Sequence, residues 1–119
     1  MTKAQVLGER RLIISDEALA LQANGLDNVA TIFAEGIVDG TQVTVLDSSG
    51  KRTSLTVIGD VPYGHKVALV DIAKGEQITK YGEEIGVATH DIRAGEYVHV
   101  HNLDSMRGRG DLEKEASNA

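Results

Sequence analysis

Two histidines separated by a single residue stand in the segment Val98-His99-Val100-His101-Asn102. In an extended strand, side chains two positions apart project from one face, with Cβ atoms about 6 to 7 Å apart. Two imidazoles at that spacing can converge on one metal ion or on one anionic substrate. A half-exposed strand that merely presents two polar residues to solvent would show the same spacing. Asn102 adds an amide, although the residue after a strand is often only a turn former.

A third histidine and two lysines could contribute to the same chemistry. His65 follows Gly64 in an expected turn, where its ring either hydrogen-bonds local backbone or takes part in a site. Lys66 comes next, and Lys80-Tyr81-Gly82 places a cation and a phenol before another glycine turn. Lysine binds carboxylates, but an ordinary solvated turn would look the same. His90 is expected to be a surface turn residue.

No complete catalytic motif accompanies these residues. The glycines do not fall in a phosphate-binding arrangement, and no serine lies in a nucleophile elbow. The sequence therefore predicts that this chain alone is not a complete enzyme.

A short repeated phrase organises the elements that must position these side chains. It consists of a β-branched residue, two variable residues, a glycine, two polar or mixed residues and a second β-branched residue. Three full copies and one degraded copy occupy residues 60–67, 71–78, 91–98 and 37–43. Each copy predicts a strand that enters a glycine-centred reversal, where glycine adopts positive φ without steric cost, and leaves as another strand. We expect Asp60, Asp71 and Asp91 to cap these turns through nearby backbone amides.

The repeat predicts an all-β domain of about seven or eight short strands in glycine-centred hairpins. Strands are expected over residues 29–33, 41–46, 53–58, 66–72, 77–80, 85–89 and 97–101. The apolar run 66–72 is expected to form the central strand. Asp47-Ser48-Ser49-Gly50 has the length and composition of a hairpin loop.

The chain divides into three parts. Residues 1–20 are expected to form an N-terminal arm, in which Leu12-Ile13-Ile14 is a possible strand and Ser15-Asp16-Glu17 a helix cap leading into residues 18–21. Residues 21–104 form the β domain, and residues 105–119 form a polar tail with little to bury.

Composition excludes several functional classes. The 119 residues carry a net charge of −6, which argues against a nucleic-acid partner because such a partner needs a basic surface. The chain has no cysteine, so it has no disulfide, no thiolate zinc site and no cysteine nucleophile. Neither an export signal nor a long apolar run is present, so we expect a cytoplasmic protein without a membrane segment.

Several motifs, taken in order, resemble one known family. They are Asp27-Asn28-Val29-Ala30, Gly64-His65-Lys66, Asp71-Ile72-Ala73-Lys74-Gly75, Lys80-Tyr81-Gly82 and His99-Val100-His101-Asn102. The family is the SAF domain of the altronate/galactarate dehydratases, which are sugar-acid hydro-lyases, and the resemblance covers roughly residues 21–104. The last motif is more similar to the altronate branch, or to the related sulfolactate sulfo-lyase small subunit, than to the galactarate branch. Tyr97 departs from the altronate pattern, which often has another histidine there.

The resemblance implies a β-clip fold and a share in a lyase site. In this family the SAF domain accompanies a larger catalytic region that eliminates water from a hydroxy acid to give a 2-keto-3-deoxy acid, with a divalent metal, usually iron. The chain then resembles a split small subunit whose large partner is a separate polypeptide. The implied metal ligands are His99 and His101. The implied substrate-binding residues are His65, Lys66, Lys80 and Asn102.

Two further expectations concern partners. The surface that meets the large subunit should be partly apolar, so the chain alone should form a homodimer or homotrimer. The alternative function is a stand-alone β-clip binding or interaction module without catalytic activity, related to SAF domains in sialic acid synthases and in pilus and flagellar assembly proteins.

Overall fold

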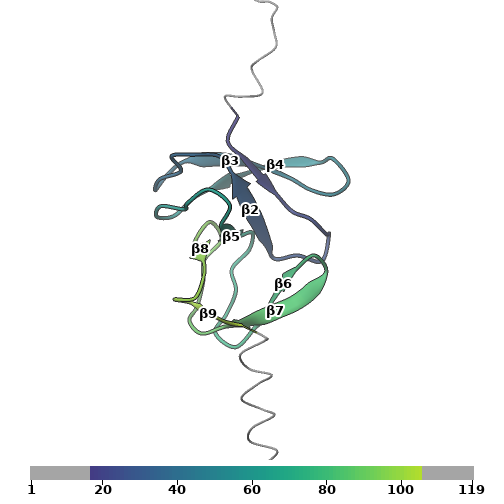
Figure 1. Ribbon diagram of the computed structural model, residues 1–119, viewed down its shortest axis with the longest axis vertical. Coiled ribbons are helices and arrows are strands. Elements are labelled where there is room, and N and C mark those ends of the chain that lie inside the picture. The colour runs from purple at the N-terminus through teal and green to yellow at the C-terminus, as the bar shows by residue number, and fades with distance from the viewer. Residues whose placement is uncertain (1–16, 106–119) are drawn as a thin grey trace, which may run out of the picture.

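The computed structural model describes residues 17–105, and this part of the chain is all-β, as the sequence predicts. It contains nine short strands and no helix (Figure 1). The strands are β1 Leu19–Leu21, β2 Val29–Phe33, β3 Gln42–Leu46, β4 Arg52–Thr56, β5 Lys66–Ala68, β6 Gln77–Lys80, β7 Glu83–Ala88, β8 Tyr97–Val98 and β9 Leu103–Ser105. Nothing helical in residues 17–105 reaches the length and hydrophobicity that a membrane crossing requires.

Two sheets form the domain. The larger has six strands in the order β4-β3-β1-β2-β5-β8, and the smaller has three in the order β6-β7-β9. Figure 1 shows the β6–β7 hairpin below the start of β2, at the opposite end of the domain from the β3–β4 hairpin. The expected hairpin loop at residues 47–50 is confirmed, because it joins β3 to β4.

The N-terminal boundary of the domain differs from the prediction. Residues 18–21 do not begin a helix, because Leu19–Leu21 forms β1, which lies parallel to β3 and antiparallel to β2. Ala20 is fully buried between these neighbours. The folded domain therefore includes the last residues of the expected arm, and the rest of the arm, residues 1–16, lies outside the described residues.

Two strand predictions near the site are also wrong. The run 66–72 is not one central strand: β5 ends at Ala68 and lies next to the edge strand β8 of the large sheet. The run is apolar because its residues contribute to two separate hydrophobic clusters. Val67 is buried in one cluster, and Ala68 and Ile72 are buried in the other. The expected strand 97–101 ends at Val98. A ninth strand, β9, follows it and includes Ser105, whereas the rest of the expected tail lies outside the described range.

The repeats pair two by two, which the sequence does not reveal. Ile72 of one copy forms an antiparallel bridge with Ile92 of another, and Ile37 forms one with Val61. Gly75 and Gly95 occupy equivalent turns with φ of +90° and +96°, the left-handed region in which glycine is favoured. The Ile72–Ile92 pair thus joins two copies of one motif into a clip with approximate two-fold symmetry.

The repeat aspartates hold this clip together, rather than capping their own turns as expected. The Asp71 carboxylate accepts a hydrogen bond from the Ala94 amide at 2.9 Å, and the Asp91 carboxylate accepts one from the Lys74 amide at 2.9 Å. In the pair joined by the Ile37–Val61 bridge, the Asp60 carboxylate accepts a long hydrogen bond of 3.4 Å from the Asp39 amide. Local capping falls to glutamates instead, since Glu76 and Glu96 accept from the amides three residues before them.

Two hydrophobic clusters form the core. The first is formed by strands of the large sheet and the segments next to them, and its buried members are Ala20, Ala30, Ile32, Ile37, Val43, Val45, Val57, Val61 and Val67. The second joins the large sheet, the small sheet and the clip, with Val29, Ala68, Ile72, Ile78, Ala88, Ile92 and Val98. Successive strand residues face opposite sides, so β5 and β8 divide their side chains between the two clusters.

Candidate functional site

His65 and His99 meet at the paired strands β5 and β8. Val67 lies opposite Tyr97 in this antiparallel ladder, which places His65, just before β5, near His99, just after β8. The two imidazole rings are 5.0 Å apart between centroids and inclined by 76°. The structure therefore brings together two of the histidines that the sequence singled out.

Tyr97 lies at the centre of this group. Its hydroxyl hydrogen-bonds Nδ1 of His65 at 2.9 Å, and its ring stacks on His99 at a centroid distance of 5.6 Å and an interplanar angle of 7°. The His101 ring lies 5.3 Å from the same phenol. Sequence reasoning treated Tyr97 only as a departure from a family pattern. Its position two residues before His99 was the available signal, because side chains two apart in a strand share a face.

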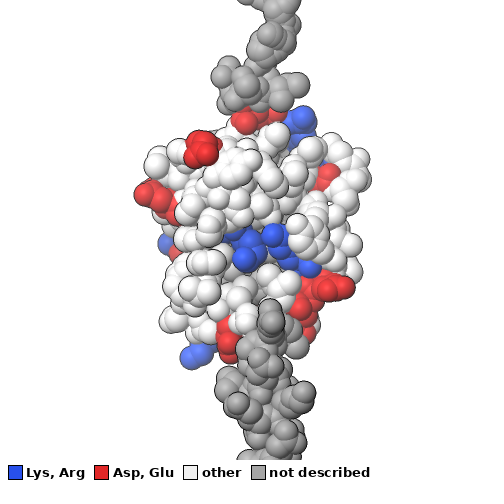
Figure 2. Space-filling model, in the orientation of Figure 1, with Lys and Arg blue, Asp and Glu red and all other residues white. Residues whose placement is uncertain are grey.

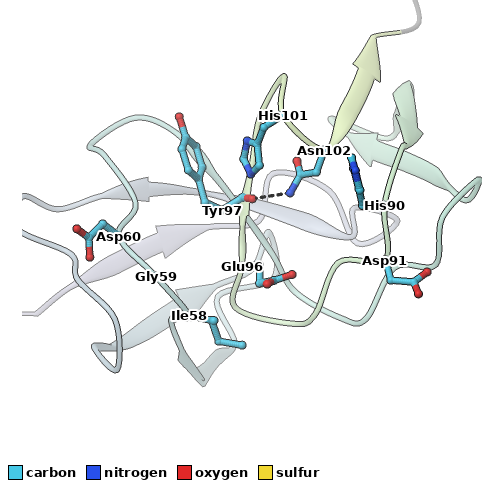
Figure 3. Close-up of a pocket in the computed structure, with 9 residues that line it drawn as sticks. All are labelled: Ile58, Gly59, Asp60, His90, Asp91, Glu96, Tyr97, His101 and Asn102. Carbon is cyan, nitrogen blue, oxygen red and sulfur yellow. Dashed lines mark hydrogen bonds between the residues drawn. The ribbon is translucent and has the colours of Figure 1, made fainter.

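The two closely spaced histidines lie on a turn rather than on one strand face, which corrects the geometry assumed from their spacing. The Asn102 amide donates to the His99 carbonyl at 3.0 Å, which closes the turn. The Asn102 side chain accepts from the His99 amide at 3.0 Å and donates to the Tyr97 carbonyl at 2.9 Å, the bond dashed in Figure 3. Asn102 is 7% exposed. Its amide group thus orients the two histidines through the backbone, and a direct contact with substrate stays a prediction.

The pKa of His99 lies below the ordinary value of histidine. Partial burial disfavours the imidazolium, and the positive charges of His65, Lys66 and His101 act in the same direction. His99 is therefore mainly neutral near pH 7, which is the form that ligates a metal or accepts a proton.

Lys66 of the large sheet and Lys80 of the small sheet form a second group, each on the strand face that contributes to the second cluster. Lys66 shares a face of β5 with buried Ala68, and Lys80 shares a face of β6 with buried Ile78. Both lysines are partly buried. Figure 2 shows basic side chains gathered at the middle of this view, over the region of β5 and β6.

Neither Lys66 nor Lys80 forms an ion pair within residues 17–105, although Glu83 lies opposite Lys80 in the β6–β7 ladder. The ion pairs in that range are Arg52–Glu17 at 2.6 Å and Arg93–Glu96 at 3.9 Å. Burial, followed by the charge of Lys80, lowers the pKa of Lys66. Two partly buried cations that repel each other and form no ion pair in this range favour an anion as their ligand. The structure thus separates the lysines from the histidine group by face, although Lys66 still acts electrostatically on His99.

Asp27 and Asn28 hold the end of β6, which carries Lys80, and the turn that follows it. Asp27 is 6% exposed, and its carboxylate accepts hydrogen bonds from the amides of Tyr81 at 3.0 Å, Gly82 at 2.8 Å and Asn24 at 3.1 Å. Tyr81 has a φ of +57°, which is uncommon for a residue with a side chain. The Asn28 side chain accepts from the Thr79 amide at 2.9 Å. Asp27 and Asn28, which directly precede β2, thus connect the large sheet to the β6–β7 hairpin.

We expect Asp27→Ala to lower the free energy of unfolding by about 2 to 4 kcal/mol, because three backbone amides lose a charged acceptor in a buried place. Urea unfolding followed by circular dichroism measures this loss. Asn24→Ala, which removes a hydrogen bond to the exposed Leu26 amide, is the control and should cost about 1 kcal/mol or less. Equal losses for the two variants would contradict the assigned role of Asp27.

A pocket of about 450 Å³ lies beside Tyr97 and His101. Its lining residues are Ile58, Gly59, Asp60, His90, Asp91, Glu96, Tyr97, His101 and Asn102 (Figure 3). His101 stands between Tyr97 and Asn102 in this view, and His90 lies beyond Asn102. His90 is exposed, as predicted for a turn residue, but it also lines this pocket with His101.

The described residues do not form a metal site by themselves. Within residues 17–105, no group of three or more histidine, aspartate or glutamate side chains is arranged to hold a metal ion. His99 and His101 could supply two ligands at most, so their assignment as metal ligands stays a prediction that requires donors from elsewhere.

The fold and the motifs define a SAF domain, and comparison with known proteins agrees. Residues 18–106 match the family described as the altronate/galactarate dehydratase SAF domain. This chain therefore belongs to that family. It is 45% identical over 100 residues to altronate dehydratase of Escherichia coli, and 38% identical over 82 residues to (2R)-sulfolactate sulfo-lyase subunit alpha of Chromohalobacter salexigens.

These relatives differ in how much of them the chain spans. The match covers 78% of this chain but 19% of altronate dehydratase. Against the Chromohalobacter subunit alpha it covers 68% of this chain and 87% of that protein. The alpha subunit of Paracoccus pantotrophus is matched over 94% of its length, at 40% identity. The chain thus corresponds to a small part of one kind of lyase and to nearly a whole subunit of another.

Proposed function

We propose that this chain is the SAF subunit of a hydroxy-acid lyase and works in the cytoplasm with a separate large catalytic subunit. The match over nearly the full length of two proteins named as subunit alpha supports a separate partner. The higher identity to altronate dehydratase supports an altronate-like reaction, in which a sugar acid loses water to give a 2-keto-3-deoxy acid.

The pair of partly buried lysines carries this proposal. An acid substrate presents a carboxylate, and Lys66 and Lys80 offer two partly buried cations that form no ion pair within residues 17–105. Elimination beside a carboxylate needs an electrophile on that carboxylate, a base for the α-proton and an acid for the leaving hydroxyl. The lysines supply the positive charge on the carboxylate, and the histidines around Tyr97 transfer a proton or bind an oxygen of the substrate.

A divalent metal, with iron as the family's usual ion, belongs to this proposal only as a group shared between subunits. His99 and His101 would contribute two ligands, and the large subunit would contribute the rest. The ion would supply Lewis-acid polarisation of the substrate oxygens.

Binding of D-altronate to the isolated chain tests the lysine site. We expect amide signals of β5 and β6 to shift in an NMR titration with altronate, but not with the uncharged sugar alcohol of the same carbon skeleton. Lys66→Met and Lys80→Met should each weaken binding by about 10-fold or more, the effect of losing one charged hydrogen bond.

Lys74→Met is the matched control, because Lys74 is an exposed lysine of the clip turn and should leave binding unchanged. Unchanged binding in the Lys66 and Lys80 variants would contradict the proposal, and binding of the sugar alcohol equal to that of altronate would favour a stand-alone binding module.

Because only the ammonium form of lysine binds an anion and the pKa of Lys66 is lowered, the affinity for altronate should fall with rising pH at a lower pH than for an ordinary lysine.

A further inference from the structure

The hydrogen bond between Tyr97 and His65 bears on which proton His65 carries. The phenol oxygen lies 2.9 Å from Nδ1, and the rings are inclined by 78° with centroids 5.4 Å apart. Within residues 17–105, no hydrogen bond is formed by Nε2, the other ring nitrogen. One ring nitrogen is thus held by the protein and the other is left for a ligand.

Backbone contacts fix His65 around this bond. Its amide donates to the Pro62 carbonyl at 3.2 Å, and its carbonyl accepts from the Ile32 amide at 2.9 Å. Tyr97 is fixed equally well, because it pairs with Val67 in the sheet and its carbonyl accepts from the Asn102 side chain. The backbones of both residues are thus held by hydrogen bonds on either side of the contact between the two rings.

The direction of the bond follows from the chemistry of the two groups. A neutral imidazole has one nitrogen that donates and one that accepts. A phenol hydroxyl is a good donor, whereas its oxygen is a weak acceptor because the lone pair is delocalised into the ring. This chemistry favours donation from the phenol to Nδ1, an arrangement that requires the proton of the neutral imidazole to lie on Nε2.

We propose that Tyr97 is a positioning residue that locks neutral His65 in the Nε2–H form. Resting on the proposed function, the consequence is a division of labour: His65 donates its Nε2–H to an oxygen of the bound acid and is not the base that removes the α-proton. The lock itself is a property of this chain and can be measured without the large subunit.

The test uses the full chain with ¹⁵N-labelled histidine, at about pH 8.5, well above the ordinary pKa of histidine. Long-range ¹H–¹⁵N correlation spectra distinguish the two neutral forms. We expect wild-type His65 to show only the Nε2–H form, and Tyr97→Phe to show a mixture of both forms. Tyr63→Phe is the matched control, because the Tyr63 ring packs on Phe33 and its hydroxyl bonds no residue within 17–105.

A wild-type spectrum with the proton on Nδ1, or a His65 spectrum unchanged by Tyr97→Phe, would overturn the lock. The wild-type measurement decides even if the variant does not fold. In the two-subunit enzyme, Tyr97→Phe should lower kcat by about 10-fold with little change in KM, as for other residues that orient a functional group. A confirmed lock with unchanged kcat would refute the role of His65 in the proposed reaction and leave the lock standing.

Discussion

Gly95→Ala is expected to lower the free energy of unfolding by at least about 3 kcal/mol, a large fraction of the stability of a small domain. Gly95 has a φ of +96°, and a Cβ there would lie 2.1 Å from the carbonyl oxygen of Thr56. The neighbour is backbone, so no flexible side chain can move away. The Gly95 carbonyl also accepts a hydrogen bond from the Ile58 amide at 2.9 Å. Moving the Gly95 backbone away from Thr56 would break this bond as well.

Gly75→Ala is the matched control. Gly75 occupies the equivalent turn of the paired repeat with a φ of +90°, but nothing lies within 4 Å of a Cβ built there. Only the strain of a positive φ remains, which costs about 1 to 2 kcal/mol. Urea unfolding of both variants gives the comparison. Similar losses at the two glycines would show that conformation, and not the contact with Thr56, decides the outcome.

In the proposed two-subunit enzyme, once it is reconstituted, His99→Ala and His101→Ala should each reduce turnover by at least about 10-fold, the lower range for losing a metal ligand or its support. Their folding should change little, by about 0.5 kcal/mol for the exposed His101, because surface substitutions rarely cost more. Turnover and thermal unfolding, measured on the same preparations, separate the two effects.

Val100→Ala is the control for these histidine variants. Val100 lies between them on the same turn and is 77% exposed, so its loss tests whether disturbing the turn is sufficient. His90→Ala is unsuitable for this purpose, because His90 lines the pocket that His101 also lines. Near-normal turnover with a lowered melting temperature in both histidine variants would assign these residues a structural role and direct attention to His65.

Local patterns in the sequence determined much of the fold. The repeated glycine phrase predicted the turns, because a reversal that needs positive φ selects glycine wherever it occurs. Strands β2 and β6 were predicted to the residue, since alternation and turn residues act over a few positions. The motifs around His65, Lys80 and His101 indicated the family, which the match over residues 18–106 confirms.

Tertiary structure decided what depends on contacts between distant residues. Residues 19–21 became a strand because β2 and β3 offered them backbone partners, although their local sequence suggested a helix. Asp71 and Asp91 bind each other's turns across the clip, because the Ile72–Ile92 bridge brings those amides within reach.

The site shows the same division. The sequence determined which histidines and lysines are present, but their grouping required the pairing of β5 with β8, which sets His65 beside His99 and makes Tyr97 their common neighbour. Gly75 and Gly95 are indistinguishable within their repeats, yet only Gly95 lies against Thr56. A local pattern predicts the backbone conformation of a residue, whereas the packing of the whole domain determines its neighbours in space.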